Sequence, residues 1–222
     1  MEEIITLLLK IFIMQNKKTN NWIVFGLSNF SYDILDAIES IGGSIDCFVT
    51  NQKVDPEIIQ RVPHDIKIIP LTSFKATSNH YFIGFMDYHK DELLEDLASY
   101  RITFDNIVHQ RAYVSKYAKL GQGNFIGANA TIAPKVTIGD FNFINRNSSI
   151  GHHSMLSNRN KTGPGVTISS LCSIGSNNAF GSNSALLPEI NIKDNIVVGA
   201  GSVVTSSIEV AGTYVGSPAR KL

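Results

Sequence analysis

The feature that most constrains this chain is an apolar residue at every sixth position of its second half. The pattern holds at 17 of 18 positions and never changes register, although only 43% of the chain is hydrophobic. A short, fixed period indicates a solenoid, in which each repeat packs against its neighbours. The positions are Val108, Val114, Leu120, Ile126, Ile132, Ile138, Ile144, Ile150, Leu156, Thr162 (the exception), Ile168, Ile174, Phe180, Leu186, Ile192, Val198, Val204 and Val210.

Six residues are too few for a helical repeat and match one short strand plus one turn. Three such units predict a coil of 18 residues with a triangular cross-section, and the coils would stack about 4.8 Å apart. The recurring apolar residue should point into this prism. Glycine often follows it, and we expect glycine there to permit backbone conformations that other residues avoid. These glycines are Gly121, Gly127, Gly139, Gly151, Gly163, Gly175, Gly181 and Gly199.

The residues two places before the apolar positions are mostly small, which predicts that they fill the inside of tight corners. Cys172 is one of them, so we interpret it as a core residue rather than a nucleophile. The others are Ala112, Ala118, Asn124, Ala130, Ser148, Ser154, Asn160 and Ser184.

The first half of the chain alternates strands with helices, which predicts a small parallel sheet. Apolar residues between positions 30 and 41 recur at helical spacing, and a second short helix carries three leucines between positions 93 and 97. The expected strands are Trp22–Phe25, Ile45–Val49 and Tyr81–Phe85.

A glycine turn, residues 26–30, joins the first strand to the first helix. Free N–H groups and the helix dipole suit a phosphate at such a turn, so Gly26, Ser28 and Asn29 are candidate nucleotide contacts. The turn has one glycine, where close approach to a phosphate usually needs two or three. The alternative is a plain turn in which Ser28 or Asn29 caps the helix.

The formal net charge of the chain is zero, which argues against a nucleic-acid or anionic-membrane binder. The charge is unevenly divided, because residues 1–108 carry nine basic and 15 acidic side chains and residues 109–222 carry ten and four. A basic repeat region suits an anionic ligand such as a coenzyme phosphate. Attraction between the two halves explains the asymmetry equally well.

The two cysteines, Cys47 and Cys172, show no metal or disulfide spacing, which fits a reducing cytoplasm. The apolar stretch Ile4–Met14 is too short to span a membrane and lacks the features of a signal peptide. We interpret residues 1–20 as an N-terminal extension, with Met14 as an alternative translation start. A Rossmann-like domain over 21–104 and a repeat domain over 105–222 should follow.

The repeat pattern resembles the hexapeptide-repeat left-handed β-helix, a class made up mostly of CoA-dependent acyltransferases. Residues 22–222 are similar to a narrower group, the sugar acetyltransferases of the sialic-acid O-acetyltransferase and bacillosamine/perosamine N-acetyltransferase family. That group joins a small Rossmann-like domain to the β-helix. The resemblance is carried by the start of the first coil, Phe104–His109, by the Asn-x-x-x-x-x-Gly-His segment, Asn145–His152, and by the closing turn, Tyr214–Arg220.

This resemblance implies an acetyltransferase that uses acetyl-CoA and no metal. His152 is then the general base toward the attacking amine or hydroxyl, a task that suits an imidazole with an ordinary pKa of about 6.5. The backbone N–H of Ser170, one coil further on, is then the donor to the oxyanion. His109, at the start of the repeats, is interpreted as structural.

The chain departs from the family directly after the implied base. The family usually has Glu or Asp there, whereas this chain has His153, which cannot supply the same negative charge. Another group then orients His152, with Asn147, Asn158 and Asn160 as candidates. Otherwise the activity is weaker, or the acceptor supplies an amine of low pKa.

A second departure is Thr162, which replaces the apolar residue of its repeat and marks a site or a subunit contact. Lys161 lies where relatives often have a histidine touching the coenzyme, so its charge either meets a phosphate or stays in water. The family pattern implies further coenzyme contacts from Gly181, Ser182, Gly199, Ala200 and Arg220.

The resemblance also implies a cytoplasmic homotrimer, with the pantetheine arm of the coenzyme between two subunits.

The expected acceptor is a nucleotide-linked 4-amino-4,6-dideoxy sugar for cell-envelope polysaccharide synthesis. Gly26, Ser28, Asn29 and His153 are its candidate contacts, although the single glycine leaves an unlinked sugar open. Sugar O-acetylation of the sialic-acid type and a non-catalytic scaffold are the alternatives. A zinc hydratase would need three clustered histidines, a pattern that the repeat half lacks.

Overall fold

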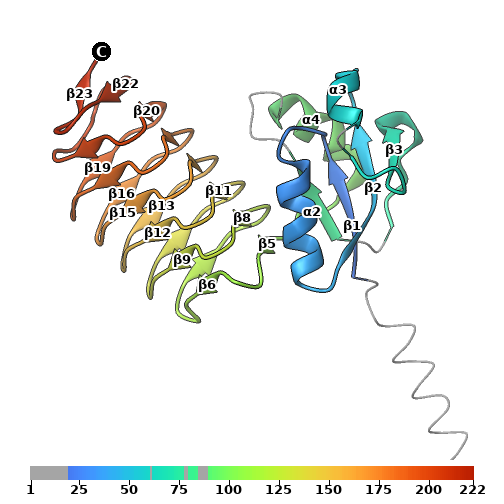
Figure 1. Cartoon of the computed structure of the whole chain (residues 1–222), viewed down its shortest axis with the longest axis horizontal. Coiled ribbons are helices and arrows are strands. Elements are labelled where there is room, and N and C mark those ends of the chain that lie inside the picture. Colours follow the sequence, from blue (N-terminus) through green and yellow to red (C-terminus); the bar gives the residue numbers. More distant parts are fainter. Residues whose placement is uncertain (1–19, 61, 78–79, 85–89) are drawn as a thin grey trace, which may run out of the picture. The chain divides into compact units, whose positions relative to one another are not determined.

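The computed structural model describes residues 20–60, 62–77, 80–84 and 90–222. These residues form two compact units, 20–102 and 103–222, which Figure 1 colours from blue to green and from green to red. The predicted N-terminal extension lies outside the described residues, apart from Asn20.

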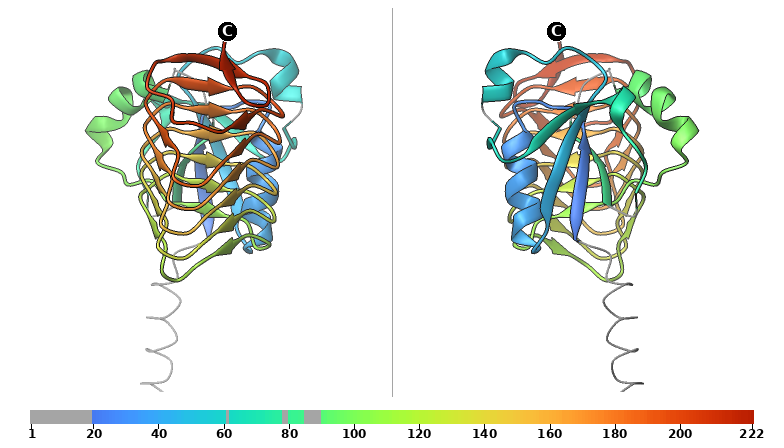
Figure 2. Two further views of the ribbon diagram at one scale, coloured as in Figure 1. Left: turned by 90° about the vertical axis from the view of Figure 1, so that its left-hand side faces the viewer. Right: turned by 90° about the vertical axis from the view of Figure 1, so that its right-hand side faces the viewer.

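A parallel sheet in the order β3-β2-β1-β4 forms the centre of the N-terminal unit, as the alternation of strands and helices predicts. Helix α2 (Ser31–Ser40) buries Ile34 and Ile38, and Figure 2 shows the strands between this helix and α4 (Lys90–Leu97). The strands are β1 (Asn21–Phe25), β2 (Ser44–Thr50), β3 (Lys67–Pro70) and β4 (His80–Ile83).

Sequence patterns did not predict two elements of this unit. The edge strand β3 has no buried side chain, and helix α3 (Pro56–Gln60) has none either. Buried elements are recognised by periodic apolar residues, and these two elements have no buried face to impose such a period. The described part of this unit also contains the 3-10 helices η1 (Leu71–Ser73) and η2 (Ala98–Tyr100).

The second unit is a parallel β-helix with three faces, which confirms the prediction from the six-residue period, and it is left-handed, as the resemblance to the hexapeptide-repeat class implies. Figure 1 shows its coils stacked one on another. One face is a six-stranded sheet of β6 (Tyr113–Val114), β9 (Thr131–Ile132), β12 (Ser149–Ile150), β15 (Thr167–Ile168), β18 (Ala185–Leu186) and β21 (Val203–Val204). Another is a five-stranded sheet of β7 (Lys119–Leu120), β10 (Thr137–Ile138), β13 (Met155–Leu156), β16 (Ser173–Ile174) and β19 (Asn191–Ile192).

The third face is an eight-stranded sheet, parallel except for its last strand. It consists of β5 (Ile107–Val108), β8 (Phe125–Ile126), β11 (Phe143–Ile144), β14 (Lys161–Thr162), β17 (Ala179–Phe180), β20 (Ile196–Val198), β22 (Gly212–Val215) and β23 (Arg220–Lys221).

Each edge of the prism is a column of four-residue corners. The glycine corner joins the eight-stranded to the six-stranded sheet at residues 109–112, 127–130, 145–148, 163–166, 181–184 and 199–202. The histidine corner joins the six-stranded to the five-stranded sheet at residues 115–118, 133–136, 151–154, 169–172 and 187–190. The asparagine corner joins the five-stranded to the eight-stranded sheet at residues 121–124, 139–142, 157–160 and 175–178, and at a shortened corner of residues 193–195.

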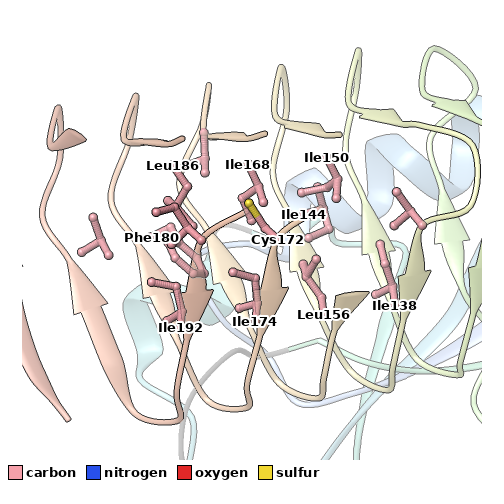
Figure 3. Close-up of a cluster of buried hydrophobic side chains, with 14 of the residues drawn as sticks. Ile138, Ile144, Ile150, Leu156, Ile168, Cys172, Ile174, Phe180, Leu186 and Ile192 are labelled. Carbon is pink, nitrogen blue, oxygen red and sulfur yellow. The ribbon is translucent and has the colours of Figure 1, made fainter. Parts of the chain in front are cut away.

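The recurring apolar side chains form the core of the β-helix, as predicted. Figure 3 shows them stacked from coil to coil inside the prism. The small corner residues from Asn124 onward are buried too, whereas Ala112 and Ala118 in the first coil are partly buried, and Cys172 is only 1% exposed. Aliphatic burial on this scale supplies the main favourable free energy of folding.

The six-residue register does not extend to its predicted end, so the prediction for Val210 is wrong. The side chain of Val210 is 58% exposed, whereas Ile208 is buried. Ile208 pairs with Ile192 and therefore takes the inward place. The final coil is shortened after Val204, because the chain turns there toward the closing strands β22 and β23.

The predicted reason for glycine after the apolar residue is also wrong. None of these eight glycines has a positive φ, and the left-handed residue lies two places later in the corner, as at Asn129 with φ 57°. Glycine is needed because the coils approach closely. A Cβ on Gly151 would lie 2.5 Å from the backbone nitrogen of Ser170, and one on Gly181 would lie 2.4 Å from that of Ala200. Steric contact with the next coil therefore selects glycine.

A ladder of asparagine side chains runs through the asparagine corner. Each Oδ1 accepts the backbone N–H found 18 residues further on, at distances of 2.7–3.0 Å. These side-chain acceptors keep the backbone N–H groups of the corner paired. The ladder consists of Asn106, Asn124, Asn142, Asn160 and Asn178.

We expect Asn142→Ala to lower the free energy of unfolding by about 1–3 kcal/mol, because it leaves the buried Asn160 N–H without its acceptor. Urea denaturation with an unchanged m-value measures this loss. Asn158→Ala is the matched control. Its Oδ1 also accepts a backbone N–H, from Asp140 at 2.8 Å, but the site is exposed and water replaces the lost partner. Equal losses in the two variants would show that burial does not set the strength of the ladder.

Candidate active site

The histidine corner presents two adjacent imidazoles to solvent. His152 and His153 follow strand β12, and both side chains are exposed. Their Nδ1 atoms lie 3.1 Å apart, with ring centroids 5.2 Å apart and ring planes at 90°. His153 is in the left-handed region with φ 60°, and its N–H donates to the Pro134 carbonyl at 3.2 Å. The fold therefore places a hydrogen-bonded imidazole pair on one edge of the prism.

The backbone of Ser170 lies on the next coil of this corner. The two coils touch there, because the Leu171 N–H donates to the His152 carbonyl at 3.0 Å. The N–H groups of Ser169 and Leu171 both donate hydrogen bonds, whereas that of Ser170 donates none within the described residues. An unpaired backbone donor near an imidazole can stabilise a developing oxyanion. The structure thus brings His152 and Ser170 together on adjacent coils.

The three asparagines considered as partners of His152 are engaged elsewhere. The Asn147 Oδ1 accepts a hydrogen bond from Asn129 in the glycine corner at 3.2 Å. Asn158 and Asn160 belong to the asparagine corner, where both bond to neighbouring coils. The hydrogen-bond partner that the structure gives the His152 ring is His153.

Thr162 marks a local break in the repeat. Its side chain is 3% exposed, and its Oγ1 accepts the Asn145 N–H at 2.8 Å and lies 3.2 Å from the Ser148 Oγ. Elsewhere the equivalent N–H bonds to a backbone carbonyl, as Gly127 does to Ile144. The hydroxyl therefore keeps a polar group paired inside an otherwise apolar prism.

The predicted coenzyme contacts gather on a different edge. The pairs Gly181-Ser182 and Gly199-Ala200 are consecutive coils of the glycine corner, and the N–H groups of Ser182 and Ala200 donate no hydrogen bond within the described part of the chain. Lys161 is in strand β14 and Arg220 in strand β23, both in the eight-stranded sheet that ends at this corner. Within one chain, the six-stranded sheet separates these residues from His152.

The turn after β1 uses Ser28 internally. The Ser28 N–H donates to the Ser31 Oγ at 3.1 Å, and the Ser28 hydroxyl accepts the Phe30 N–H at 3.2 Å and donates to the Gly84 carbonyl at 2.9 Å. The Gly26 N–H donates to the Val49 carbonyl at 2.7 Å, while Asn29 is exposed. These bonds favour the interpretation of Ser28 as a residue that stabilises the turn.

A cavity of about 390 Å³ lies in the N-terminal unit, at a place where no sequence motif indicates a site. It opens at the carboxyl ends of β2 and β3, the edge at which ligands bind in open α/β sheets. The sequence does not predict this cavity, because β3, which forms one side of it, was not predicted. One available signal was that Thr50 and Asn51 directly follow a predicted strand. The lining residues are Thr50, Asn51, Pro70, Leu71, Thr72, Asp96 and Tyr100.

Two further chemistry-bearing residues of the repeats, Cys172 and His109, are buried. Burial raises the pKa of the Cys172 thiol, and its Sγ lies 3.3 Å from the Leu187 carbonyl oxygen, so this sulfur is a poor nucleophile. His109 is buried, and its Nδ1 accepts the Arg111 N–H at 3.0 Å.

Among the described residues, no group of three His, Cys, Asp or Glu could hold a metal ion, and no helix is long and apolar enough to cross a membrane.

The repeats match two hexapeptide families. The family described as "Bacterial transferase hexapeptide (six repeats)" matches residues 117–152. The family described as "Hexapeptide repeat of succinyl-transferase" matches residues 172–206. No curated protein sequence matches the chain.

Solved structures show the fold along nearly the whole chain. A mutant of perosamine N-acetyltransferase from Caulobacter crescentus, in complex with CoA and GDP-perosamine, has a TM-score of 0.80 at 18% identity, over 91% of this chain and 96% of that one. The acetyltransferase domain of PglB from Neisseria gonorrhoeae, in complex with acetyl coenzyme A, has a TM-score of 0.81 at 19% identity, over 92% of this chain and 100% of that one. WeeI from Acinetobacter baumannii has a TM-score of 0.72 at 18% identity, over 90% of this chain and 99% of that one.

Proposed function

We infer that the chain transfers the acetyl group of acetyl-CoA to the amine of a nucleotide-linked amino sugar. The observation that carries this inference is the exposed His152 imidazole on the coil next to the unpaired Ser170 N–H. The hexapeptide repeats support an acyltransferase. Fold similarity to a perosamine N-acetyltransferase and to a domain that binds acetyl coenzyme A supports the choice of acceptor and donor.

The two groups suit direct transfer without an acylated protein. The amine nitrogen attacks the thioester carbonyl carbon, and the Nε2 atom of His152 takes the N–H proton. The carbonyl oxygen becomes an oxyanion that accepts a hydrogen bond from the Ser170 N–H. The C–S bond then breaks, the proton passes from His152 to the departing sulfur, and the products are an amide and free CoA. The buried Cys172 has no part in this reaction.

The site is completed by a second copy of the chain. His152 and the glycine-corner residues lie on different edges of one prism, so packing of the glycine corner of one subunit against the histidine corner of the next would bring both sets to one cleft. The histidine corner also exposes Tyr117, Leu171 and Leu187 by 56%, 50% and 44%. Exposed apolar side chains of this size suit contact with a second subunit, which supports a homotrimer.

The N-terminal unit would hold the nucleotide of the acceptor. Because Ser28 already bonds within its turn, the cavity beside Thr50 and Asn51 is the better place for the base and ribose. Lys161 and Arg220 would contact the phosphates of the coenzyme, since the repeat half carries an excess of basic residues.

An acceptor panel tests the proposed function. We expect CoA release from acetyl-CoA with nucleotide-linked 4-amino-4,6-dideoxy sugars, much slower release with the same sugars unlinked, and none with sialic acid. Thiol release is measured with a chromogenic reagent, and the acetylated product is identified by mass spectrometry. Transfer to sialic acid instead would establish O-acetylation. Absence of both turnover and acetyl-CoA binding would leave a non-catalytic scaffold.

A further inference from the structure

The bond between the two imidazoles has a direction that decides whether His152 can act as a base. A hydrogen bond between two Nδ1 atoms requires one of them to carry a proton and the other to be bare. If His152 donates, its Nε2 is bare and can accept a proton. If His153 donates, the proton of His152 is on Nε2, and the ring cannot serve as a base at that atom.

Resting on the proposed function, we propose that His153 is a positioning residue that accepts the Nδ1–H of His152 and holds its Nε2 bare. The Nδ1–Nδ1 distance of 3.1 Å is that of a hydrogen bond. When His152 takes the proton of the amine, the bond to His153 becomes charge-assisted and strengthens. The neutral His153 ring thereby holds the tautomer of His152 and stabilises its protonated form, as a carboxylate does more strongly in a Ser-His-Asp triad.

The backbone conformation of residue 153 determines which substitutions it tolerates. His153 has φ 60°, and the same corner position on the neighbouring coils is also left-handed, at Lys135 and Leu171. Asparagine occupies left-handed positions elsewhere in the β-helix, as at Asn129 and Asn177. Asparagine and aspartate adopt this conformation more readily than other non-glycine residues. Both are therefore suitable probes at position 153.

The charged groups around the pair lie on other coils of the histidine corner. Lys116 and Lys135 are on the preceding coils, where their Nζ atoms lie 5.1 and 6.0 Å from the centroid of the Tyr117 ring. Glu189 is two coils beyond His153, with the uncharged Leu171 between them. Within the described residues, none of these charges forms an ion pair with either imidazole. The direct hydrogen-bond partner of the His152 ring is therefore His153.

Three substitutions of His153 separate positioning from a structural role. His153→Ala removes the acceptor and should lower kcat roughly 10-fold or more with little change in either KM. His153→Asn keeps a neutral acceptor and should restore most of kcat. His153→Asp adds a negative charge and should move the acidic limb of the kcat/KM profile to higher pH by about one unit. Asn177→Ala, at another exposed left-handed position, is the control that should change none of these values.

Imidazole ¹⁵N NMR gives a readout that does not depend on activity. With the His152 signals assigned from a His152→Gln variant, we expect Nδ1 to be protonated and Nε2 bare in the unaltered chain. In His153→Ala, Nε2 should carry the proton. This result would stand even if the acceptor panel failed, so the two failures are distinguishable. A protonated Nε2 in the unaltered chain, or an unchanged kcat in His153→Ala, would overturn the proposal.

Discussion

Replacement of His152 by alanine should lower kcat for acetyl transfer roughly 10²–10⁴-fold, the range typical of a lost general base. The amine must lose a proton as it attacks, and His152 is the exposed imidazole beside the unpaired N–H of Ser170. Folding should be unaffected, because the side chain is outside the prism. The measurement is kcat from thiol release, with oligomeric state followed by light scattering.

The control for this variant is Lys116→Ala. Lys116 occupies the same place in the histidine corner two coils earlier, and its side chain is also exposed. Its truncation removes a similar amount of surface side chain but leaves His152 on the coil next to the Ser170 N–H, so kcat should stay near the wild-type value. Turnover retained by His152→Ala would refute the role of this histidine as the base.

Replacement of Ser170 by proline should lower kcat roughly 10²–10³-fold, the usual effect of removing one oxyanion donor. Proline has no N–H, so this substitution deletes the proposed donor itself. The histidine corner accepts proline at this place, because Pro134 and Pro188 occupy it two coils before and one coil after Ser170. The lost N–H makes no hydrogen bond within the described residues, so stability should change little.

The matched variant is Ser170→Ala, which removes the hydroxyl and keeps the backbone donor. We expect its kcat to equal that of the unaltered chain, while the Kd for acetyl-CoA, measured by calorimetry, is similar in both variants. If alanine and proline slowed the reaction equally, the hydroxyl would be the active group. If neither slowed it, the oxyanion would be stabilised by another donor.

The residue pattern alone predicted the β-helix, its core and the edge that carries His152. This was possible because every coil needs an inward apolar side chain, so the requirement repeats in the sequence at the period of the structure. The strands and helices with a buried face, such as β1 and α2, were predicted for the same reason. The elements that bury nothing, α3 and β3, have no such pattern and were missed, and the cavity beside them was missed with them.

The period of the sequence places Ser170 one coil after His152, but the tertiary structure alone decided the atomic contacts between coils. It showed that glycine is selected by contact with the next coil, that Ile208 replaces Val210 in the core, and that the Asn147 side chain bonds away from His152. It also gave His152 its neighbouring ring as a partner. These facts depend on the corner conformation of single residues and on atoms that approach from another coil. The period of the sequence indicates which residues of a strand face inward, but it does not specify the distances between atoms of different coils.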